Sequence, residues 1–440
     1  MKCGLINKTD DTNTDMLTDS MRRKMKTIIS TGPGRLHLFE SAVAIRQEGI
    51  EMEVITGWVP KITAKKRKII DMLGRLVGRN NLSDGMIKRT PPGLPIEKIK
   101  SCTLAEFYIQ GLFKLSGFRI LARAKAAVYG WTFFGKQSRK YIRDAAIFHV
   151  RSGAGAGEAI EKARKEGMKI IVDHSIAHPK EILRQLNKAG GPTKINRYLT
   201  TYPDDPFWTL VLEDCHKSDI LLVNSFYVKD SFVREAFPAE KIRIVGLGIN
   251  ESFIGQKRNY SRTEKIKICF SGGFGLRKGA NIIIKSIGML IERGMPFSLD
   301  IIGSVMSDIV IPEWFKDDSR ILFYGHLPQA RMKEILSGCD IYIFPTYTEG
   351  AAQSVREAMG IGLPVITTFQ SGAPIIHEEN GIIIRDDDPE ALTNAIVRLA
   401  ESEEERKRIG TAACATIRDR YSWKAYARKV KNIYEEILCM

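Results

Sequence analysis

The sequence predicts a doubly wound α/β protein built from two Rossmann-like halves, and three observations support this prediction. Short apolar runs alternate with helical stretches along the chain. The runs are apolar at nearly every position, as expected of parallel strands that are buried on both faces. The pattern stops near residue 248 and starts again near residue 265, so one architecture is used twice.

Apolar runs mark the expected strands of each half. Those of the first half are 27–31, 52–56, 146–150, 169–172, 219–223 and 242–245. Those of the second half are 266–270, 299–302, 321–324, 341–344, 364–367 and 381–384. Helical stretches such as 155–166 lie between them. We interpret residues 246–264, which are glycine-rich and then polar, as the linker between the halves.

This pattern divides the chain into domains. We expect a disordered leader over 1–25, an N-terminal domain over 26–248 and a C-terminal domain over 249–420. Residues 421–440 are expected to form a helix that returns to the N-terminal domain. The segment 60–145 fits the alternating pattern least well, and we expect a basic insert of helices and loops there.

Composition excludes several classes of protein. Hydrophobic residues make up 44% of the chain, too many for a disordered protein and ordinary for a globular one. No apolar run reaches about 18 residues, so we expect no membrane-spanning helix. The seven cysteines include no CxxC pair. We therefore expect neither a disulfide framework nor a zinc site, and a reducing, cytoplasmic location.

The net charge of +16 is concentrated in one region. Residues 54–150 hold 19 lysines and arginines but 5 acidic residues, a surplus of 14 positive charges. Such a region favours an anionic partner, such as acidic lipid, a phosphorylated acceptor or nucleic acid. Two interpretations of its helices stay open, an amphipathic face against a membrane or an ordinary solvated surface.

The stretch 348–366 carries the most informative pattern. A strand ends at Pro345, a loop of small residues follows, and a helix is expected to start near Gln353. The loop therefore lies at the carboxyl end of a parallel sheet, where open α/β folds bind ligands, and the helix start favours a phosphate. Glu349 and Glu357 would flank that phosphate and accept hydroxyl groups. The competing interpretation is a capped helix with solvated carboxylates.

A glycine-rich turn over 270–279 also joins a strand to a helix. Its glycines permit close approach of the backbone to a ligand, and Arg277 and Lys278 can meet a diphosphate. The spacing is not that of a Walker A loop. The competing interpretation is a glycine-rich turn with solvated cations.

Two further strand ends carry weaker signals. The turn 31–40 contains Gly34 and His37 but lacks the third glycine of a dinucleotide fingerprint. His174 follows the strand at 169–172, where its side chain can face a ligand, although a lone histidine is more often structural. His174 and His178 are four residues apart, but Pro179 argues against a shared helix face, so we expect no metal site.

Together these motifs resemble the retaining glycosyltransferases of family 4, which have the GT-B fold of two Rossmann-like domains facing each other across a cleft. The family signature Glu-x7-Glu corresponds to Glu349 and Glu357, and Lys278-Gly279 matches its lysine-glycine motif. The resemblance extends from about residue 26 to the end of the chain and is strongest over 265–400.

The resemblance implies a role for each residue. Glu349 would bind hydroxyls of the transferring sugar, Glu357 the donor ribose, and Lys278 the diphosphate leaving group. His174 would lie near the reacting sugar. Further residues would complete the site, on the donor side Gly273, Arg277, Gly350, Ala351 and Ser354, and on the acceptor side Gly34 and His37.

One position departs from the family pattern. Many members have an arginine five residues before the lysine, where this chain has Gly273. Arg277, next to Lys278, is the candidate replacement.

The resemblance implies transfer of a sugar from a nucleotide-diphosphate sugar to a glycan or lipid-linked acceptor, in cell-surface polysaccharide or glycolipid biosynthesis. Retention of configuration is implied, with no metal and no other cofactor. We further expect contact with an anionic membrane surface on its cytoplasmic face. Two alternatives stay open, a nucleotide-sugar epimerase of the same fold and a basic nucleic-acid-binding protein. The basic region lacks an RNA-recognition motif with interleaved aromatic residues, so we do not expect nucleic acid as a partner.

Overall fold

A computed structural model of the chain describes residues 25–34, 37–60, 68–72, 83, 93–191, 205–257, 259–261 and 264–440. The described residues fall into two compact units. The first unit lies within Met1–Asp173, Leu210–Leu221 and Ala427–Met440, and the second within His174–Thr209 and Leu222–Tyr426. The predicted leader before Met25 and much of the predicted basic insert lie outside the described residues.

Strands from the first part of the chain form one parallel sheet. They are β1 (Thr27–Ser30), β2 (Met52–Thr56), β3 (Ile99–Ser101), β4 (Ile147–Arg151), β5 (Lys169–His174), β6 (Ile220–Val223) and β7 (Ile242–Ile244). Their spatial order is β3-β2-β1-β4-β5-β6-β7, and each pair with a described register is parallel. The strand order reverses between β1 and β4, which is where doubly wound sheets bind ligands.

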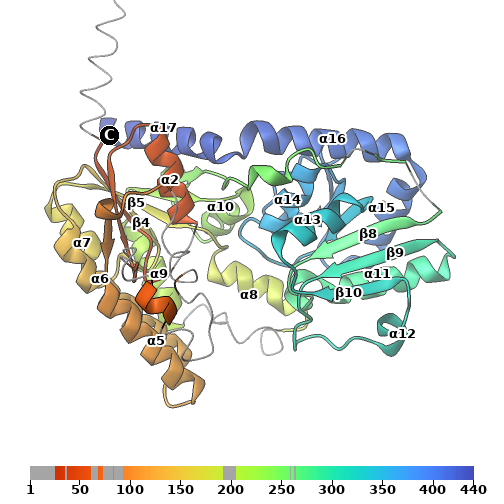
Figure 1. The fold of residues 1–440 in the computed structure, drawn as a ribbon, viewed down its shortest axis with the longest axis horizontal. Coiled ribbons are helices and arrows are strands. Elements are labelled where there is room, and N and C mark those ends of the chain that lie inside the picture. The colour runs from red at the N-terminus through yellow and green to blue at the C-terminus, as the bar shows by residue number, and fades with distance from the viewer. Residues whose placement is uncertain are drawn as a thin grey trace, which may run out of the picture. The chain divides into compact units, whose positions relative to one another are not determined.

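A second parallel sheet follows. Its strands are β8 (Ile266–Ser271), β9 (Phe297–Ile302), β10 (Ile321–Gly325), β11 (Ile341–Phe344), β12 (Val365–Thr368) and β13 (Ile382–Ile384). Their order is β10-β9-β8-β11-β12-β13, so the order reverses between β8 and β11. Figure 1 shows β10, β9 and β8 as neighbouring arrows. Both sheets therefore have the Rossmann-like strand order.

Helices connect the strands. Those before the second sheet are α2 (Leu38–Gln47), α5 (Thr103–Gly117), α6 (Arg123–Ser138), α7 (Ala159–Lys165), α8 (Pro179–Lys188), α9 (Pro206–Lys217) and α10 (Phe226–Val233). Those that follow are α11 (Ala280–Glu292), α12 (Glu313–Lys316), α13 (Gln329–Ser337), α14 (Gln353–Ile361), α15 (Pro389–Glu401), α16 (Glu403–Arg420) and α17 (Trp423–Cys439). Short 3-10 turns are η1 (Ile96–Lys98), η2 (Arg139–Tyr141), η3 (Ala239–Lys241), η4 (Glu251–Phe253), η5 (Leu276–Lys278) and η6 (Phe369–Ser371).

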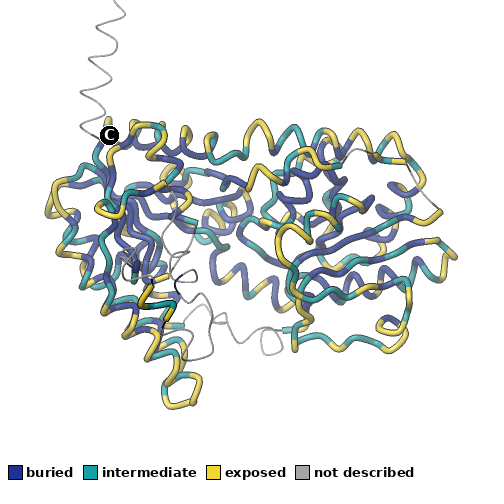
Figure 2. The backbone as a smooth tube through the Cα atoms, viewed as in Figure 1, coloured by how far each residue is buried: buried dark blue, intermediate teal, exposed yellow. Residues whose placement is uncertain are grey.

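The strands form the cores of both units. Strands β1, β6, β11 and β12 are buried at every position. Figure 2 shows buried residues along the strands and exposed residues on helices and loops. The predicted fold class, two doubly wound halves, is confirmed, because apolar runs without alternation are buried on both faces here.

Two elements differ from the sequence-based expectation. Strand β3 lies in the segment for which helices and loops were expected, since three residues with Lys100 at the centre do not form a recognisable apolar run. Helix α7 begins at Ala159 rather than at residue 155, because Gly157 and Glu158 adopt left-handed backbone with φ of 65° and 66°.

Three further observations concern cysteines, membrane spans and metal ligands. The cysteines in the described part of the chain are all free thiols. No helix among the described residues has the length and apolar character needed to cross a bilayer. Nor do three or more metal-binding side chains gather anywhere in those residues.

Candidate functional site

The loop after β8 brings two cations close to the loop after β11. Gly279 joins η5 to α11 with left-handed backbone, at φ of 78°. A Cβ added at Gly279 would lie 2.0 Å from the carbonyl oxygen of Pro345. Glycine at this position therefore lets the two loops pack together at the point where the strand order reverses.

The two loops meet in an ion-pair cluster. Arg277 Nη1 donates a hydrogen bond to Glu349 Oε1 at 2.6 Å and another to the carbonyl oxygen of Thr348 at 2.9 Å. Lys278 Nζ lies 3.5 Å from the same carboxylate oxygen and 5.1 Å from the centre of the Phe344 ring. Burial raises the pKa of Glu349, but the charges of Arg277 and Lys278 outweigh it, so this pKa lies below its ordinary value. Glu349 is thus an ionised acceptor between two cations.

Helix α14 begins beside this cluster with an amino terminus that no side chain caps. Its cap residue is Ala352, which makes no side-chain cap hydrogen bond. Tyr342 ties the first turn of α14 to the end of β8, because its hydroxyl lies 3.0 Å from Ser271 Oγ and is also hydrogen-bonded to Ser354. The amides of this first turn and the helix dipole favour an anion.

Glu357 lies one turn into α14 and is buried. Gln353 Nε2 donates a hydrogen bond to Glu357 Oε1 at 2.9 Å. Burial raises the pKa of Glu357, while the Gln353 hydrogen bond and the charge of Arg356 partly offset that rise. The carboxylate keeps acceptor capacity for hydroxyl donors, because a carboxylate offers several lone pairs.

Two contacts within the second unit fix the backbone at Gly350. Ser225 Oγ donates a hydrogen bond to the carbonyl oxygen of Gly350 at 2.5 Å. A Cβ added at Gly350 would lie 1.8 Å from the carbonyl oxygen of Ser175. The residue before Ser175 is His174, which is buried with its ring edge-on to Phe232, ring centres 5.0 Å apart. The structure therefore brings the backbone next to His174 against the loop that carries Glu349.

The residues predicted for the acceptor side lie in the first unit, after β1. His37 Nε2 lies 3.0 Å from Asp173 Oδ1, and His149 Nε2 lies 3.8 Å from Asp173 Oδ2. Burial acts to raise the pKa of Asp173, but the two histidines hold it well below its ordinary value. Gly34 is exposed, and a Cβ added there would meet no atom within 4 Å. A buried carboxylate thus fixes the ring of His37.

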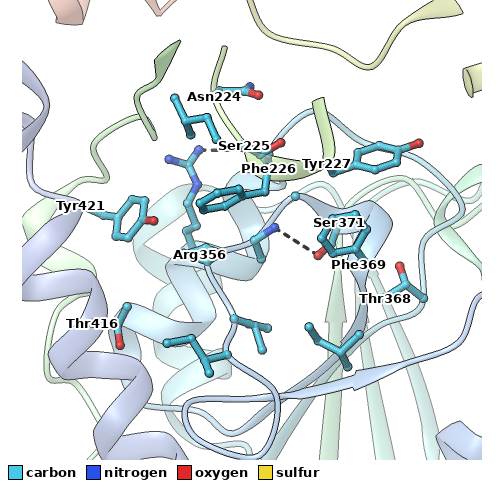
Figure 3. A pocket seen from close by; sticks show the side chains of 18 of the residues that line it. Asn224, Ser225, Phe226, Tyr227, Arg356, Thr368, Phe369, Ser371, Thr416 and Tyr421 are labelled. Carbon is cyan, nitrogen blue, oxygen red and sulfur yellow. Dashed lines mark hydrogen bonds between the residues drawn. The ribbon is translucent and has the colours of Figure 1, made fainter. Parts of the chain in front are cut away.

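A cavity of about 240 Å³ lies in the second unit, and it is lined by residues of α10 and α14 and by the segment 368–376 (Figure 3). Arg356 enters it with only 2% of its surface exposed. Its guanidinium donates to the carbonyl oxygens of Leu247 and Ala351. Burial lowers the pKa of Arg356 to about 10. These bonds tie α14 to the loop before it, so Arg356 positions the helix that carries Glu357.

The structure also identifies residues that the sequence patterns did not assign. Asp173, Tyr342 and Arg356 are buried polar side chains that hold His37, Ser354 and α14. Only Asp173 had a local signal, since it directly precedes His174 at a strand end. Tyr342 and Arg356 lie within an apolar run and a helix, where nothing in the sequence marks them as polar anchors.

The match to a protein family covers the residues of the second sheet. Residues 265–402 match the model of the family described as Glycosyl transferases group 1. The amylovoran biosynthesis glycosyltransferase AmsK of Erwinia amylovora is 25% identical over 232 residues, which cover 50% of this chain and 57% of that protein. The chain therefore matches little more than half the length of this relative.

Solved structures resemble nearly the whole chain. Sucrose-phosphate synthase from Thermosynechococcus elongatus has a TM-score of 0.60 at 14% identity, covering 94% of this chain and 100% of that one. HepE of Anabaena in complex with UDP has a TM-score of 0.57 at 12% identity, with 94% and 100% covered. Together with the two sheets, these neighbours define the chain as a protein of the GT-B fold. Its second Rossmann-like half, over 265–402, is similar to the group 1 glycosyltransferases.

Proposed function

We propose that this chain moves a sugar from a nucleotide-diphosphate sugar to a glycan or lipid-linked acceptor. The observation that carries the proposal is the meeting of Lys278, Glu349 and the uncapped start of α14 where the second sheet reverses its strand order. The family match covers this site. The UDP bound to HepE of Anabaena supports a nucleotide donor.

The cations supply the chemistry that the transfer needs. Departure of a nucleoside diphosphate builds negative charge on its phosphates. Lys278 and the first-turn amides of α14 would stabilise this charge electrostatically, and a preorganised donor of this kind contributes about 10²–10³ in rate. Arg277 adds positive charge to the same cluster, although its hydrogen bonds go to Glu349 and Thr348. This charge is our candidate replacement for the arginine that many relatives carry at the position of Gly273.

The carboxylates would hold the two ends of the donor. Glu349 is ionised and would accept hydroxyls of the transferring sugar, and Glu357 would accept a ribose hydroxyl. Gly350, Ala351 and Ser354 would lie along the diphosphate. We propose that His174 lies near the reacting sugar. Retention of configuration, with no protein nucleophile and no metal, remains part of this proposal.

The proposal also covers the acceptor and the place of the protein in the cell. The relative AmsK is named for amylovoran biosynthesis. We propose that this chain likewise serves cell-surface polysaccharide or glycolipid synthesis. Gly34 and His37 would contact the acceptor, His37 being held by Asp173. The setting would be the cytoplasmic face of the membrane.

A thermal-shift panel of UDP, GDP, ADP, CDP and TDP tests the donor site. The variants are Lys278→Ala and Glu357→Ala, and the matched control is Lys285→Ala, because Lys285 is an exposed lysine on α11. We expect one diphosphate to stabilise the unmodified protein and the control, and to stabilise the two site variants much less. A folded protein that no diphosphate stabilises would overturn the donor site.

Turnover assays distinguish the proposed sugar transfer from the alternative functions. The diphosphate that stabilises the protein in the thermal-shift panel identifies the base of the donor. The protein is then incubated with sugar nucleotides of that base, with and without acceptors and with and without a chelator. Transfer that needs an acceptor, survives the chelator and preserves the anomeric configuration, as measured by NMR, supports the full proposal. Conversion of the donor alone would instead indicate an epimerase, and RNA binding without nucleotide binding would indicate a nucleic-acid-binding protein.

A further inference from the structure

Helices α5 and α6 form a hairpin in the first unit (Figure 1). Side chains fill the space between the two helices. Tyr108 lies at the edge of this contact, where its ring packs edge-on against Phe133, with ring centres 4.9 Å apart, and stays 45% exposed. Gly130 faces Ile109, and a Cβ added at Gly130 would lie 2.4 Å from Ile109 Cγ1. The two helices therefore pack against each other on the inner side of the hairpin. The remaining apolar residues of the hairpin are not needed for that contact.

The outer side of the hairpin is apolar as well. Large hydrophobic side chains are exposed along α5 and at the hairpin tip, where Phe118 is 76% and Ile120 is 73% exposed. Those on α5 recur at helical spacing, three, four or seven residues apart, so they form one stripe. The exposed residues of the stripe and tip are Leu104, Phe107, Tyr108, Leu115, Phe118 and Ile120. Figure 2 shows the tip as exposed.

The charges around this stripe have one sign. Between Thr103 and Ser138 the basic residues are all exposed, namely Lys114, Arg119, Arg123, Lys125 and Lys136. The single acidic residue there, Glu106, is buried and accepts a hydrogen bond from the backbone amide of Trp58. Every exposed charge on the hairpin is therefore positive.

We propose that the α5–α6 hairpin docks the protein on an anionic lipid bilayer. Apolar side chains at the tip would enter the headgroup region while the surrounding lysines and arginines meet lipid phosphates, as in interfacial amphipathic helices. The proposal gives a structural basis to the membrane setting proposed above, on which it rests, but it does not depend on the sugar transfer. It identifies the docking residues among the described part of the basic region.

Charge and hydrophobicity together favour this occupant over others. A nucleic acid would satisfy the basic residues but would leave Leu104, Leu115 and Ile120 without a role, because phosphate contacts need no aliphatic side chains. A second copy of the chain would bring an equally positive hairpin, and like charges would repel across the contact. An anionic bilayer satisfies both features at once.

Vesicle flotation with the full chain tests the proposal. The vesicles are phosphatidylcholine alone, or equal parts of phosphatidylcholine and phosphatidylglycerol, at low and high salt. The apolar variant is Phe118→Ser with Ile120→Ser, and the charge variant is Lys114→Glu with Lys125→Glu. The matched control is Val310→Ser, because Val310 is an exposed apolar residue of the second unit, 87% exposed. These residues are exposed, so we expect matching melting temperatures.

We expect binding to anionic vesicles that weakens at high salt and falls about tenfold or more on neutral vesicles. Each hairpin variant should lose about tenfold or more of this binding, and the control none. Equal binding to both vesicle types, or unchanged binding by the hairpin variants, would overturn the proposal. RNA binding that is tighter than vesicle binding would also overturn the proposal. A dimer of the unmodified protein that the apolar variant no longer forms would do the same. Diphosphate thermal shifts, measured on the same variants, report separately on the donor site.

Discussion

Arg277 Nη1 lies 2.6 Å from Glu349 Oε1, and this contact joins the loop after β8 to the loop after β11. Lys278 faces the same carboxylate oxygen at 3.5 Å. The cluster keeps Glu349 ionised although it is partly buried, because two cations outweigh the loss of solvent. The residue that we propose to bind sugar hydroxyls therefore depends on its neighbours for its charge.

Replacement of Arg277 by alanine should shift the pH dependence of transfer. With one cation removed, burial raises the pKa of Glu349, so the carboxylate becomes protonated at higher pH than in the unmodified protein. The acid limb of kcat/KM against pH should move upward, and the plateau rate should fall by about 10²-fold. Arg293→Ala, on an exposed arginine at the end of α11, should leave the profile unchanged. An unmoved acid limb in Arg277→Ala would show that Glu349 ionisation does not limit the rate.

Replacement of Tyr342 by phenylalanine should weaken binding at the proposed phosphate site. The variant loses the hydroxyl that joins Ser271 and Ser354, which should cost about 1 kcal/mol of folding free energy. Diphosphate affinity should fall several-fold, because the first turn of α14 is no longer tied to β8. Titration calorimetry with the preferred diphosphate gives the affinity.

Tyr347→Phe is the matched control for this change. Tyr347 is also buried and loses hydrogen bonds to Asn281 and Asp387, so the stability cost should be similar. Its diphosphate affinity should stay near that of the unmodified protein. Equal loss of affinity in both variants would mean that general destabilisation, and not the Tyr342 tie, weakens binding.

Replacement of Gly350 by alanine should displace the loop that carries Glu349. The new Cβ would lie 1.8 Å from the carbonyl oxygen of Ser175, a backbone atom that cannot rotate away. We expect a loss of about 1–3 kcal/mol in unfolding free energy together with loss of diphosphate binding. Gly111→Ala provides the contrast, since that Cβ meets no atom within 4 Å on helix α5, and it should stabilise by about 0.5–1 kcal/mol. Urea unfolding measures both changes.

Replacement of Asp173 by asparagine should change stability in a pH-dependent way. The folded-state pKa of Asp173 lies below its unfolded value, so its stabilising contribution is present above that unfolded value and is lost as pH falls through the folded one. At pH about 7 the variant should be about 1–3 kcal/mol less stable, and the deficit should shrink below pH about 4. Asp144→Asn, on an exposed carboxylate, should show no such deficit. A deficit that stays constant with pH would exclude the ionised pairing with His37.

Local patterns predict much of this fold because they report burial. Strand β11 is an apolar run that becomes fully buried, and helix α14 begins at Gln353 as the change from small residues to a helical pattern predicts. Strand β3 escaped prediction because three edge residues with a central lysine carry no such pattern. The start of α7 also escaped, since left-handed backbone at Glu158 is unusual for a residue other than glycine.

The amino-acid order alone indicated two Rossmann-like halves, the glycine turn before Lys278 and the spacing of Glu349 and Glu357 on α14, because these features depend on neighbours a few residues apart. The tertiary structure decided which side chains meet. Arg277 reaches Glu349 across 72 positions, and His37 reaches Asp173 across 136. Such contacts depend on which strand ends the folded sheet brings together, and no local pattern encodes that proximity.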